Sequence, residues 1–369
     1  MPENAGGRLE INLAALAENY QLLSNKTPNS ETAAAVKADA YGLGIEQVAP
    51  VLVKSGCRTF FVALPEEGVK LRKLAPDATI YVLAGIWPES LELLFANRLT
   101  PVLNSLQDVK LWENTAAAAS TPFALHVDTG MNRLGLDVGQ IGEVSHLKPQ
   151  LIMTHFACAD DPAHPLNQKQ FNAFSEIRKM FPQARASLAN SAAILSRNDC
   201  QFDLVRPGIA LYGGAAVNGQ KNPMQGVVRL QGRIVQVRQI KSGTPIGYGA
   251  THTFDRDSKV AIVAVGYADG YHRSASGSGV PLSEIDGGGF GFINGCKVPI
   301  VGRISMDLTA FDITDVPDNS VNQGDWPRDW IELIGENIPV EDVAASAGTI
   351  DYEVLTSLGR RFARSYING

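Results

Sequence analysis

The sequence predicts a closed (β/α)8 barrel followed by a mostly β domain, an α/β plus β fold class. Between about residues 10 and 225, eight short apolar runs alternate with longer amphipathic segments, and after about residue 226 the pattern becomes rich in strands. Alternating strands and helices indicate βαβ units, and eight strands favour a TIM-like barrel over an open sheet. We therefore expect a barrel domain at 1–225 and a β domain at 226–369, with a short N-terminal strand packing on the β domain.

The individual elements follow from apolar runs and turn residues. The expected barrel strands are 33–37, 59–63, 79–83, 101–104, 123–127, 151–154, 186–189 and 203–206. The clearest crossover helices are 45–55, 66–74, 106–119 and 167–181. The strands expected in the β domain are 227–240, 259–265, 290–293, 298–301, 308–313 and 330–334. The segment 274–289, rich in Gly and Ser, reads as a flexible loop.

Composition excludes several classes of protein. The chain of 369 residues is 45% hydrophobic and has a net charge of −6, without an extended basic stripe, which argues against a nucleic-acid or anionic-membrane partner. Arg360, Arg361 and Arg364 read as the last turns of a helix. Four scattered cysteines suggest neither a disulfide frame nor a zinc site. The N-terminus lacks the pattern of a signal peptide, so we expect a cytoplasmic protein.

Lys37 is the most informative residue, because it ends an apolar run that is expected to form the first barrel strand. An ammonium among apolar side chains loses hydration, which favours the neutral amine and makes it a nucleophile for carbonyl compounds, including aldehyde cofactors. On position alone, a lysine that ends a strand and extends to solvent is the commoner arrangement. The residues at the other strand ends favour the chemical interpretation.

Barrel enzymes build their active sites at the C-terminal ends of the strands. The polar residues expected there are Lys37, Arg133, His155, Asn190, Ser191, Arg206 and Gly208. The loops after strands seven and eight often bind phosphate, and a nucleophilic lysine facing a phosphate site is what pyridoxal phosphate requires. Taken singly, Ser191 is as readily explained as a helix N-cap, and His155 as a structural histidine.

A metal site is the competing interpretation of the segment 155–164. It holds His155, Asp160, Asp161 and His164. Barrel metalloenzymes usually draw their ligands from several strands, whereas these four residues follow one strand. We therefore expect no metal. A Rossmann interpretation is equally weak, because the early pair of glycines lacks the third glycine of that motif.

Ordered blocks extend through nearly the whole chain. They are Ala35-Val36-Lys37-Ala38-Asp39-Ala40-Tyr41-Gly42-Leu43-Gly44, His126 to Gly135, Thr154-His155-Phe156-Ala157, Asn190-Ser191, Arg206 to Tyr212, Gly247 to Thr251, Gly266 to Gly270, Gly302 to Asp307 and Ile350 to Glu353. In these blocks the chain resembles the alanine racemases, which are fold-type III pyridoxal-phosphate enzymes with a barrel followed by a β domain.

The resemblance implies two bases on opposite faces of the substrate Cα, as inversion requires. Lys37 holds pyridoxal 5'-phosphate and serves one face, and Tyr248 serves the other. A phenol is a poor base at neutral pH, so His155 and Arg206 are implied to assist. Arg206 also faces the pyridine nitrogen, and because a guanidinium keeps its protons, that nitrogen stays unprotonated and the cofactor is a weaker electron sink.

The remaining assignments come from the same resemblance. The residues implied to hold the phosphate are Tyr41, Ser191, Tyr352 and the backbones of Gly208 and Ile209. Arg133 and the backbone amide of Met306 are implied to bind the substrate carboxylate. Tyr248 and Tyr352 are implied to favour alanine over longer amino acids.

The resemblance also implies a homodimer. In the family, the counterparts of Tyr248 and Met306 come from the partner subunit, so each active site is shared. The expected role is to supply D-alanine for peptidoglycan, although a catabolic enzyme would have the same chemistry. One departure is His126, at a position where relatives often carry a carbamylated lysine that orients the substrate-binding arginine. A histidine cannot form the carbamate, so another group, such as a bound anion, must hold Arg133.

Three alternatives stay open. A racemase of the same fold for a larger amino acid, such as serine, would carry the same motifs. A barrel-type decarboxylase shares the lysine and the β domain, but those enzymes generally offer the pyridine nitrogen a carboxylate, which Arg206 is not. A non-catalytic carrier of pyridoxal phosphate would lack the β domain with Tyr248.

Overall fold

The computed structural model describes residues 5–277, 288–317 and 329–369. The chain forms two compact units, one made of Leu16–Gln225 and the other of Met1–Ala15 with Gly226–Gly369. We call them the barrel unit and the β unit. Most of the predicted loop at 274–289 lies outside the described residues.

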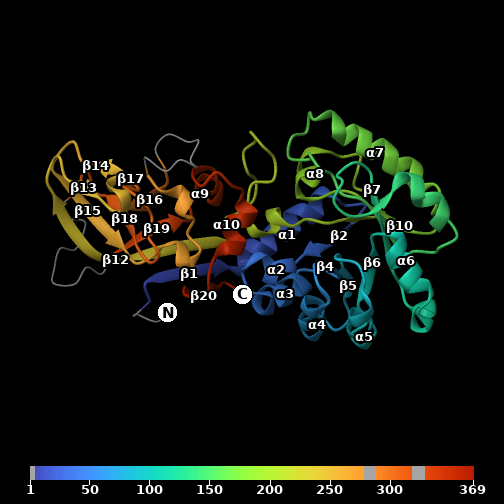
Figure 1. Ribbon diagram of the computed structural model, residues 1–369. Coiled ribbons are helices and arrows are strands. Elements are labelled where there is room, and N and C mark those ends of the chain that lie inside the picture. Colours follow the sequence, from blue (N-terminus) through green and yellow to red (C-terminus); the bar gives the residue numbers. More distant parts are fainter. Residues whose placement is uncertain (1–4, 278–287, 318–328) are drawn as a thin grey trace. The chain divides into compact units, whose positions relative to one another are not determined.

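The barrel unit contains a curled parallel sheet whose strands follow chain order (Figure 1). In spatial order they are β10 (Arg185–Ser187), β9 (Leu151–Met153), β7 (Ala124–Asp128), β6 (Thr100–Leu103), β5 (Thr79–Val82), β4 (Thr59–Val62) and β3 (Ala34–Ala35), with the short β8 (Leu136–Asp137) beside β7. The strands are buried apolar runs, as expected where both faces of a parallel sheet are covered.

Hydrogen bonds join the two ends of this sheet. Strand β11 (Leu204–Val205) pairs in parallel with β2 (Glu31–Thr32), which directly precedes β3. On its other side, the Asp203 amide donates to Ala186 and the Arg206 amide donates to Ala189. The eight predicted barrel strands are all present, within two residues at each end. The predicted fold class, a barrel followed by a mostly β domain, is confirmed.

The crossover helices are mostly where the sequence predicts them. They are α3 (Ile45–Lys54), α4 (Pro65–Leu74), α5 (Leu91–Ala96), α6 (Leu106–Glu113), α7 (Pro165–Arg178) and α8 (Ser191–Ser196), preceded by α1 (Leu13–Lys26). The prediction for 106–119 was wrong at its C-terminal end. Helix α6 ends at Glu113 because Thr115 is extended, and a 3-10 turn at Ala116–Ser120 follows.

In the β unit, the long strand β12 (Val228–Ile240) organises the sheet. Its first half pairs with β1 (Gly7–Asn12) and β19 (Trp330–Ile334), and its second half pairs with β15 (Ser258–Val263). The other strands are β13 (Pro245–Ile246), β14 (His252–Thr253), β16 (Phe290–Ile293), β17 (Cys296–Pro299), β18 (Thr309–Asp312) and β20 (Ala363–Ile367). Strand β20 lies parallel to β1. Two short helices, α9 (Val340–Ser346) and α10 (Asp351–Ser357), belong to this unit.

The helix predicted around the C-terminal arginines is wrong. Helix α10 ends at Ser357, Arg360 and Arg361 lie in a turn, and Arg364 is in β20. The alternation of exposed and buried side chains is weak there, so the sequence pattern does not distinguish the two structures.

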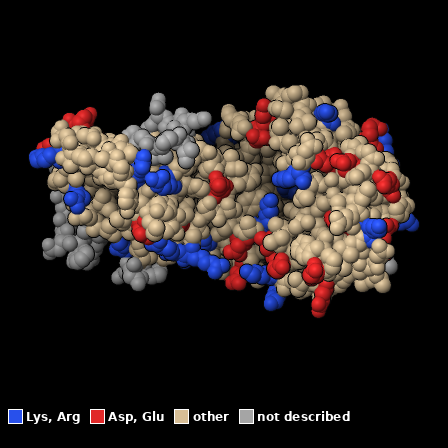
Figure 2. Space-filling view, viewed as in Figure 1, with Lys and Arg blue, Asp and Glu red and all other residues tan. Residues whose placement is uncertain are grey.

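The charged surface is mixed. Figure 2 shows acidic and basic side chains interspersed over the visible face. In the described part of the chain, no helix combines the length and apolar character that a membrane crossing needs.

Candidate active site

Most of the predicted site residues in the barrel unit follow the C-terminal ends of its strands. Lys37 follows β3, His155 follows β9, Ser191 follows β10 and Arg206 follows β11, while Arg133 lies in the loop after β7. Parallel strands place these ends at one edge of the sheet. Direct contacts join several of these residues, so the structure assembles this half of the predicted site.

Lys37 begins an unusual turn. The next four residues, Ala38, Asp39, Ala40 and Tyr41, all have φ between 54° and 56°. They form a left-handed helical turn, where the sequence predicted only the end of a strand. Non-glycine residues rarely adopt this conformation in succession, because their Cβ atoms crowd the backbone. Gly42 and Gly44, with φ of 81° and 98°, connect this turn to the start of α3.

The environment of Lys37 favours the neutral amine. Burial is the main cause that lowers the pKa of Lys37, and the positive charge of Arg133 lowers it further. The carboxylate of Glu67 acts in the opposite direction. A lowered pKa raises the fraction of amine that can attack a carbonyl or accept a proton at neutral pH.

Arg206 is buried and held by its neighbours. Its guanidinium donates to the carbonyl oxygen of Thr154 at 2.6 Å, to Oγ of Ser187 and to Nδ1 of His155 at 3.3 Å. Burial lowers the pKa of Arg206 to about 9. The side chain is therefore still a cation at neutral pH.

His155 is a neutral hydrogen-bond acceptor toward Arg206. Burial and the nearby charges of Arg206 and Arg133 lower the pKa of His155 well below its usual value. A guanidinium only donates hydrogen bonds, so Nδ1 of the histidine must accept and its proton must lie on Nε2. The carbonyl oxygen of His155 accepts from Gln170 at 2.9 Å, which fixes the backbone there.

The turn after β11 forms a cradle of backbone amides. The hydroxyl of Ser191 accepts from the amides of Gly208 at 2.9 Å and Ala210 at 3.3 Å. The Ile209 amide has no acceptor within the described residues. A Cβ added at Gly208 would clash with the hydroxyl of Tyr41, so only glycine lets that phenol approach.

This cradle has the donor chemistry that a phosphate group needs. Its donors are backbone N–H groups and hydroxyls from separate parts of the barrel unit. The N-cap interpretation of Ser191 was wrong, because Asn190 caps α8 by accepting from Ala193 at 3.0 Å. The Ser191 hydroxyl is thus directed to the turn after β11.

Arg133 is an exposed residue on a loop fixed by one aspartate. Asp128 accepts from the amides of Gly130 and Met131 at 2.8 Å and from the amide of Arg133 at 3.2 Å. The loop backbone is therefore ordered, while the guanidinium has no ion pair within the described residues.

His126 is buried close to Arg133. Its Nδ1 lies 2.9 Å from Oδ1 of Asn104, whose amide nitrogen donates to the carbonyls of Leu83 and Val102. Oδ1 must then accept, so Nδ1 carries the proton and Nε2 is left as an acceptor. Burial, Arg206 and Arg133 lower the pKa of His126 to about 4, against a smaller opposing effect of Asp128.

The β unit carries the remaining predicted residues on short turns. Tyr248 begins a 3-10 turn between β13 and β14 and is 69% exposed. Met306 is 54% exposed, and its backbone amide has no acceptor within the described residues. Tyr352 lies in the first turn of α10 and is partly exposed. These three residues belong to the β unit.

The polar residues of the segment 155–164 have other partners. Asp160 accepts from Asn218 at 2.9 Å, and His164 caps α7 by accepting from Leu166 at 3.2 Å. Across residues 5–277, 288–317 and 329–369, no three His, Cys, Asp or Glu side chains come close enough to hold a metal ion.

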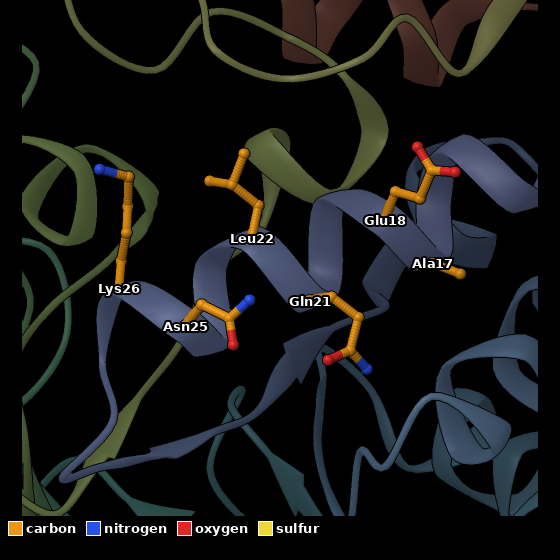
Figure 3. A pocket seen from close by; sticks show the side chains of 6 residues that line it. All are labelled: Ala17, Glu18, Gln21, Leu22, Asn25 and Lys26. Atoms are coloured by element: carbon orange, nitrogen blue, oxygen red, sulfur yellow. The ribbon is translucent and has the colours of Figure 1, made fainter.

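A hollow on the surface of α1 lies apart from these residues. It has a volume of about 540 Å³ and is lined by Ala17, Glu18, Gln21, Leu22, Asn25 and Lys26 (Figure 3). All six side chains come from one helix, and none is among the predicted site residues.

Sequence reasoning missed several residues that support the site. Glu67 contacts the turn after Lys37, and Asn104 contacts His126. Ser187 contacts Arg206, and Tyr212 stacks on Tyr41. Asn104 ends a predicted strand, so the search for polar residues at strand ends had the signal to find it. Glu67 is three residues after the N-cap of α4, a position where a glutamate normally indicates a helix start.

Known proteins resemble the chain over nearly its full length. The model of the alanine racemase N-terminal domain matches residues 11–216, and that of the C-terminal domain matches residues 227–366. An alanine racemase of Rhizobium meliloti is 49% identical, covering 99% of this chain and 98% of the relative. A biosynthetic alanine racemase of Agrobacterium fabrum is 47% identical, covering 99% and 95%.

A solved structure shows the same architecture. The crystal structure of alanine racemase from Bartonella henselae, with covalently bound pyridoxal phosphate, has a TM-score of 0.89 and 36% identity. The match covers 98% of this chain and all of that one. The resemblance drawn from the sequence motifs is therefore confirmed.

Proposed function

The chain belongs to the alanine racemase family, and from this premise we propose that it interconverts L-alanine and D-alanine with pyridoxal 5'-phosphate. The observation that carries the proposal is the barrel end, where Lys37, the Arg206–His155 pair and the Ser191–Gly208 cradle follow neighbouring strands. A neutral amine and a phosphate cradle at one barrel end fit an aldehyde cofactor with a phosphate group.

The cofactor supplies a conjugated ring that withdraws electrons from the substrate Cα when it is bound. In our proposal the hydroxyls of Ser191, Tyr41 and Tyr352 and the backbone of Gly208 and Ile209 would hold the phosphate. The support from the structure is the amide cradle and the close approach of Tyr41 to Gly208.

Arg206 faces the ring nitrogen in this proposal and limits how strongly the ring withdraws electrons. Its protons are retained at neutral pH, and neutral His155 has no proton to spare on Nδ1. Arg206 would therefore donate a hydrogen bond to the ring nitrogen without giving up a proton. This arrangement disfavours reactions that need a long-lived carbanion, such as transamination.

Lys37 and Tyr248 move the protons. Nζ of Lys37 exchanges a proton with one face of Cα, and its lowered pKa provides the neutral amine that this step needs. Oη of Tyr248 serves the opposite face. Removal on one face and delivery on the other inverts the configuration.

The substrate carboxylate is held by Arg133 and the backbone amide of Met306. The exposed guanidinium and the amide without an acceptor in the described structure are both available donors. The acceptor that His126 keeps at Nε2 supports a role in orienting Arg133, in place of a carbamylated lysine.

A head-to-tail homodimer completes the site in our proposal. Tyr248, Met306 and Ile350 are 69%, 54% and 60% exposed in the β unit. Large exposed apolar side chains commonly mark surfaces that contact another protein. Light scattering measures the oligomeric state. Mixing inactive Lys37→Ala and Tyr248→Phe chains tests whether each active site is shared between two subunits. Heterodimers should regain activity at one of their two sites.

We further propose that the enzyme acts in the cytoplasm and supplies D-alanine for peptidoglycan. The four cysteines are free thiols, which fits a reducing compartment. Growth of a strain lacking the gene, with and without D-alanine, tests this role.

The decisive experiment is incubation of the protein and pyridoxal phosphate with L-alanine in D₂O. We expect D-alanine that carries deuterium at Cα. Deuterium exchange without inversion would remove Tyr248 as the second base. Absence of both, or faster turnover of serine than of alanine, would overturn the proposed substrate.

A further inference from the structure

The carboxylate of Glu67 joins two segments that are distant in sequence. Its Oε1 accepts from the amide of Ala38 at 2.6 Å. Its Oε2 accepts from the amides of Ala63 at 2.7 Å and Leu64 at 3.2 Å. Ala38 directly follows Lys37, and Leu64 is the N-cap of α4. One side chain thus ties the start of the left-handed turn to the start of a crossover helix.

The left-handed turn needs such support. Non-glycine residues are strained in this conformation, and strained segments persist only where their surroundings hold them. Tyr41, at the far end of the turn, stacks on Tyr212 with ring centroids 4.5 Å apart. Asp39 accepts from the amide of Ile45 at 3.0 Å. Glu67 holds the end next to Lys37.

Glu67 also contributes a negative charge beside Lys37. The charged groups that act on the Lys37 pKa are Arg133, which lowers it, and Glu67, which raises it. His155, which follows β9, is neutral at pH 7, because its pKa lies well below the usual value. Glu67 therefore partly offsets the lowering of the Lys37 pKa by burial and by Arg133.

We propose that Glu67 is a positioning residue for Lys37: its carboxylate holds the backbone from which the lysine side chain projects and balances the charge around the amine. This inference rests on the role proposed for Lys37 above. Glu67 acts through the amide of Ala38 and through its charge, so it is not itself a catalytic residue.

The test compares Glu67→Gln with Glu66→Gln. Glu66 lies in the same first turn of α4, is exposed, and makes no side-chain hydrogen bond or ion pair within the described residues. Both changes remove one carboxylate from the start of the helix. Their difference therefore isolates the contacts and the position of Glu67.

Two quantities are measured on the full-length protein after any bound cofactor has been removed. The first is amide hydrogen exchange of the peptide 37–44, and the second is the pH midpoint for acetylation of Lys37 by acetic anhydride. In Glu67→Gln we expect exchange to rise about tenfold, because local opening becomes easier. We expect the midpoint to fall by about one pH unit, because a nearby negative charge is lost. Glu66→Gln should change neither quantity.

Wild-type values of either quantity in Glu67→Gln would overturn the proposal. Should that variant fail to fold, Glu67→Asp carries the test, because it keeps the charge but is too short to span both peptides. It should exchange faster with a midpoint within about 0.3 units of the wild type, and unchanged exchange would be contrary to the proposal. Neither readout needs racemase activity, so failure of the wild type to racemise alanine would be a separate result.

Discussion

The barrel unit and the β unit hold their predicted site residues in different ways. In the barrel unit, Arg206 and Ser191 are 6% and 2% exposed, and each makes hydrogen bonds within the unit. In the β unit, Tyr248 and Met306 are more than half exposed and lie on short turns. Arg206 and Ser191 are therefore preorganised by their own fold, whereas Tyr248 and Met306 present free surfaces. Mutations should separate the two groups by their effects on stability and on catalysis.

The largest effect is expected for Lys37→Ala, in the barrel unit. Loss of the amine removes both the attachment point for the cofactor and one base, so racemisation should fall by about 10⁴-fold or more. The measurements are D-alanine formation and covalent retention of pyridoxal phosphate after borohydride reduction, read by mass spectrometry. Lys54→Ala, an exposed lysine at the end of α3, is the control. Retention of both properties in Lys37→Ala would refute its assignment.

Tyr248→Phe tests the β-unit side of the comparison. Removing one hydroxyl should lower racemisation by about 10³-fold, because one face of Cα loses its base. Since the side chain is exposed, the free energy of unfolding should change by less than about 0.5 kcal/mol. Tyr366→Phe, in β20, is the matched change on the same unit. Full turnover in Tyr248→Phe would show that the two-base mechanism is wrong.

Arg206→Ala and Arg133→Ala sharpen the comparison between held and exposed residues. Arg206→Ala leaves Thr154, Ser187 and His155 without their donor, so we expect a loss of about 2–4 kcal/mol in the free energy of unfolding. Arg133→Ala should cost less than about 0.5 kcal/mol, because its side chain is exposed. Urea denaturation measures both values. Equal losses would mean that the hydrogen bonds of Arg206 do not preorganise the barrel end.

The sequence predicts the barrel well because its strands are continuous apolar runs of suitable length. Lys37 is recognisable because it ends such a run. The left-handed turn after it is not predictable from local preference, since Ala38, Asp39, Ala40 and Tyr41 all disfavour that conformation individually. It depends on tertiary contacts, including the carboxylate of Glu67.

The family resemblance extends further than residue chemistry does. It names Tyr248 and Met306, which no strand-end argument selects, because they lie on turns of the β unit. It also identifies His126 as a departure from the family pattern, but it does not say which residues contact His126. The partner of His126, Asn104, comes from the neighbouring strand, and contacts between strands are not visible in one sequence.

The last expected effect concerns His126 and the pH dependence of stability. Its pKa is about 4 in the folded protein and 6.5 in its ordinary state, because of burial and the charges of Arg206 and Arg133, which outweigh Asp128. Above pH 6.5 both states are neutral at this site. Below pH 6.5 the unfolded chain gains a proton that the folded chain does not take, so stability falls until about pH 4 and then levels off.

His126→Gln removes this contribution while leaving that of His155, whose pKa is shifted in the same direction. Between pH 7 and pH 4.5 the wild type should lose about 2 kcal/mol more stability than His126→Gln. Urea unfolding at a series of pH values measures the difference. His146→Gln, at an exposed histidine, should follow the wild type. If His126→Gln also follows the wild type, the folded protein does not keep His126 neutral. Its Nε2 is then not the acceptor that orients Arg133, and another group must take that role.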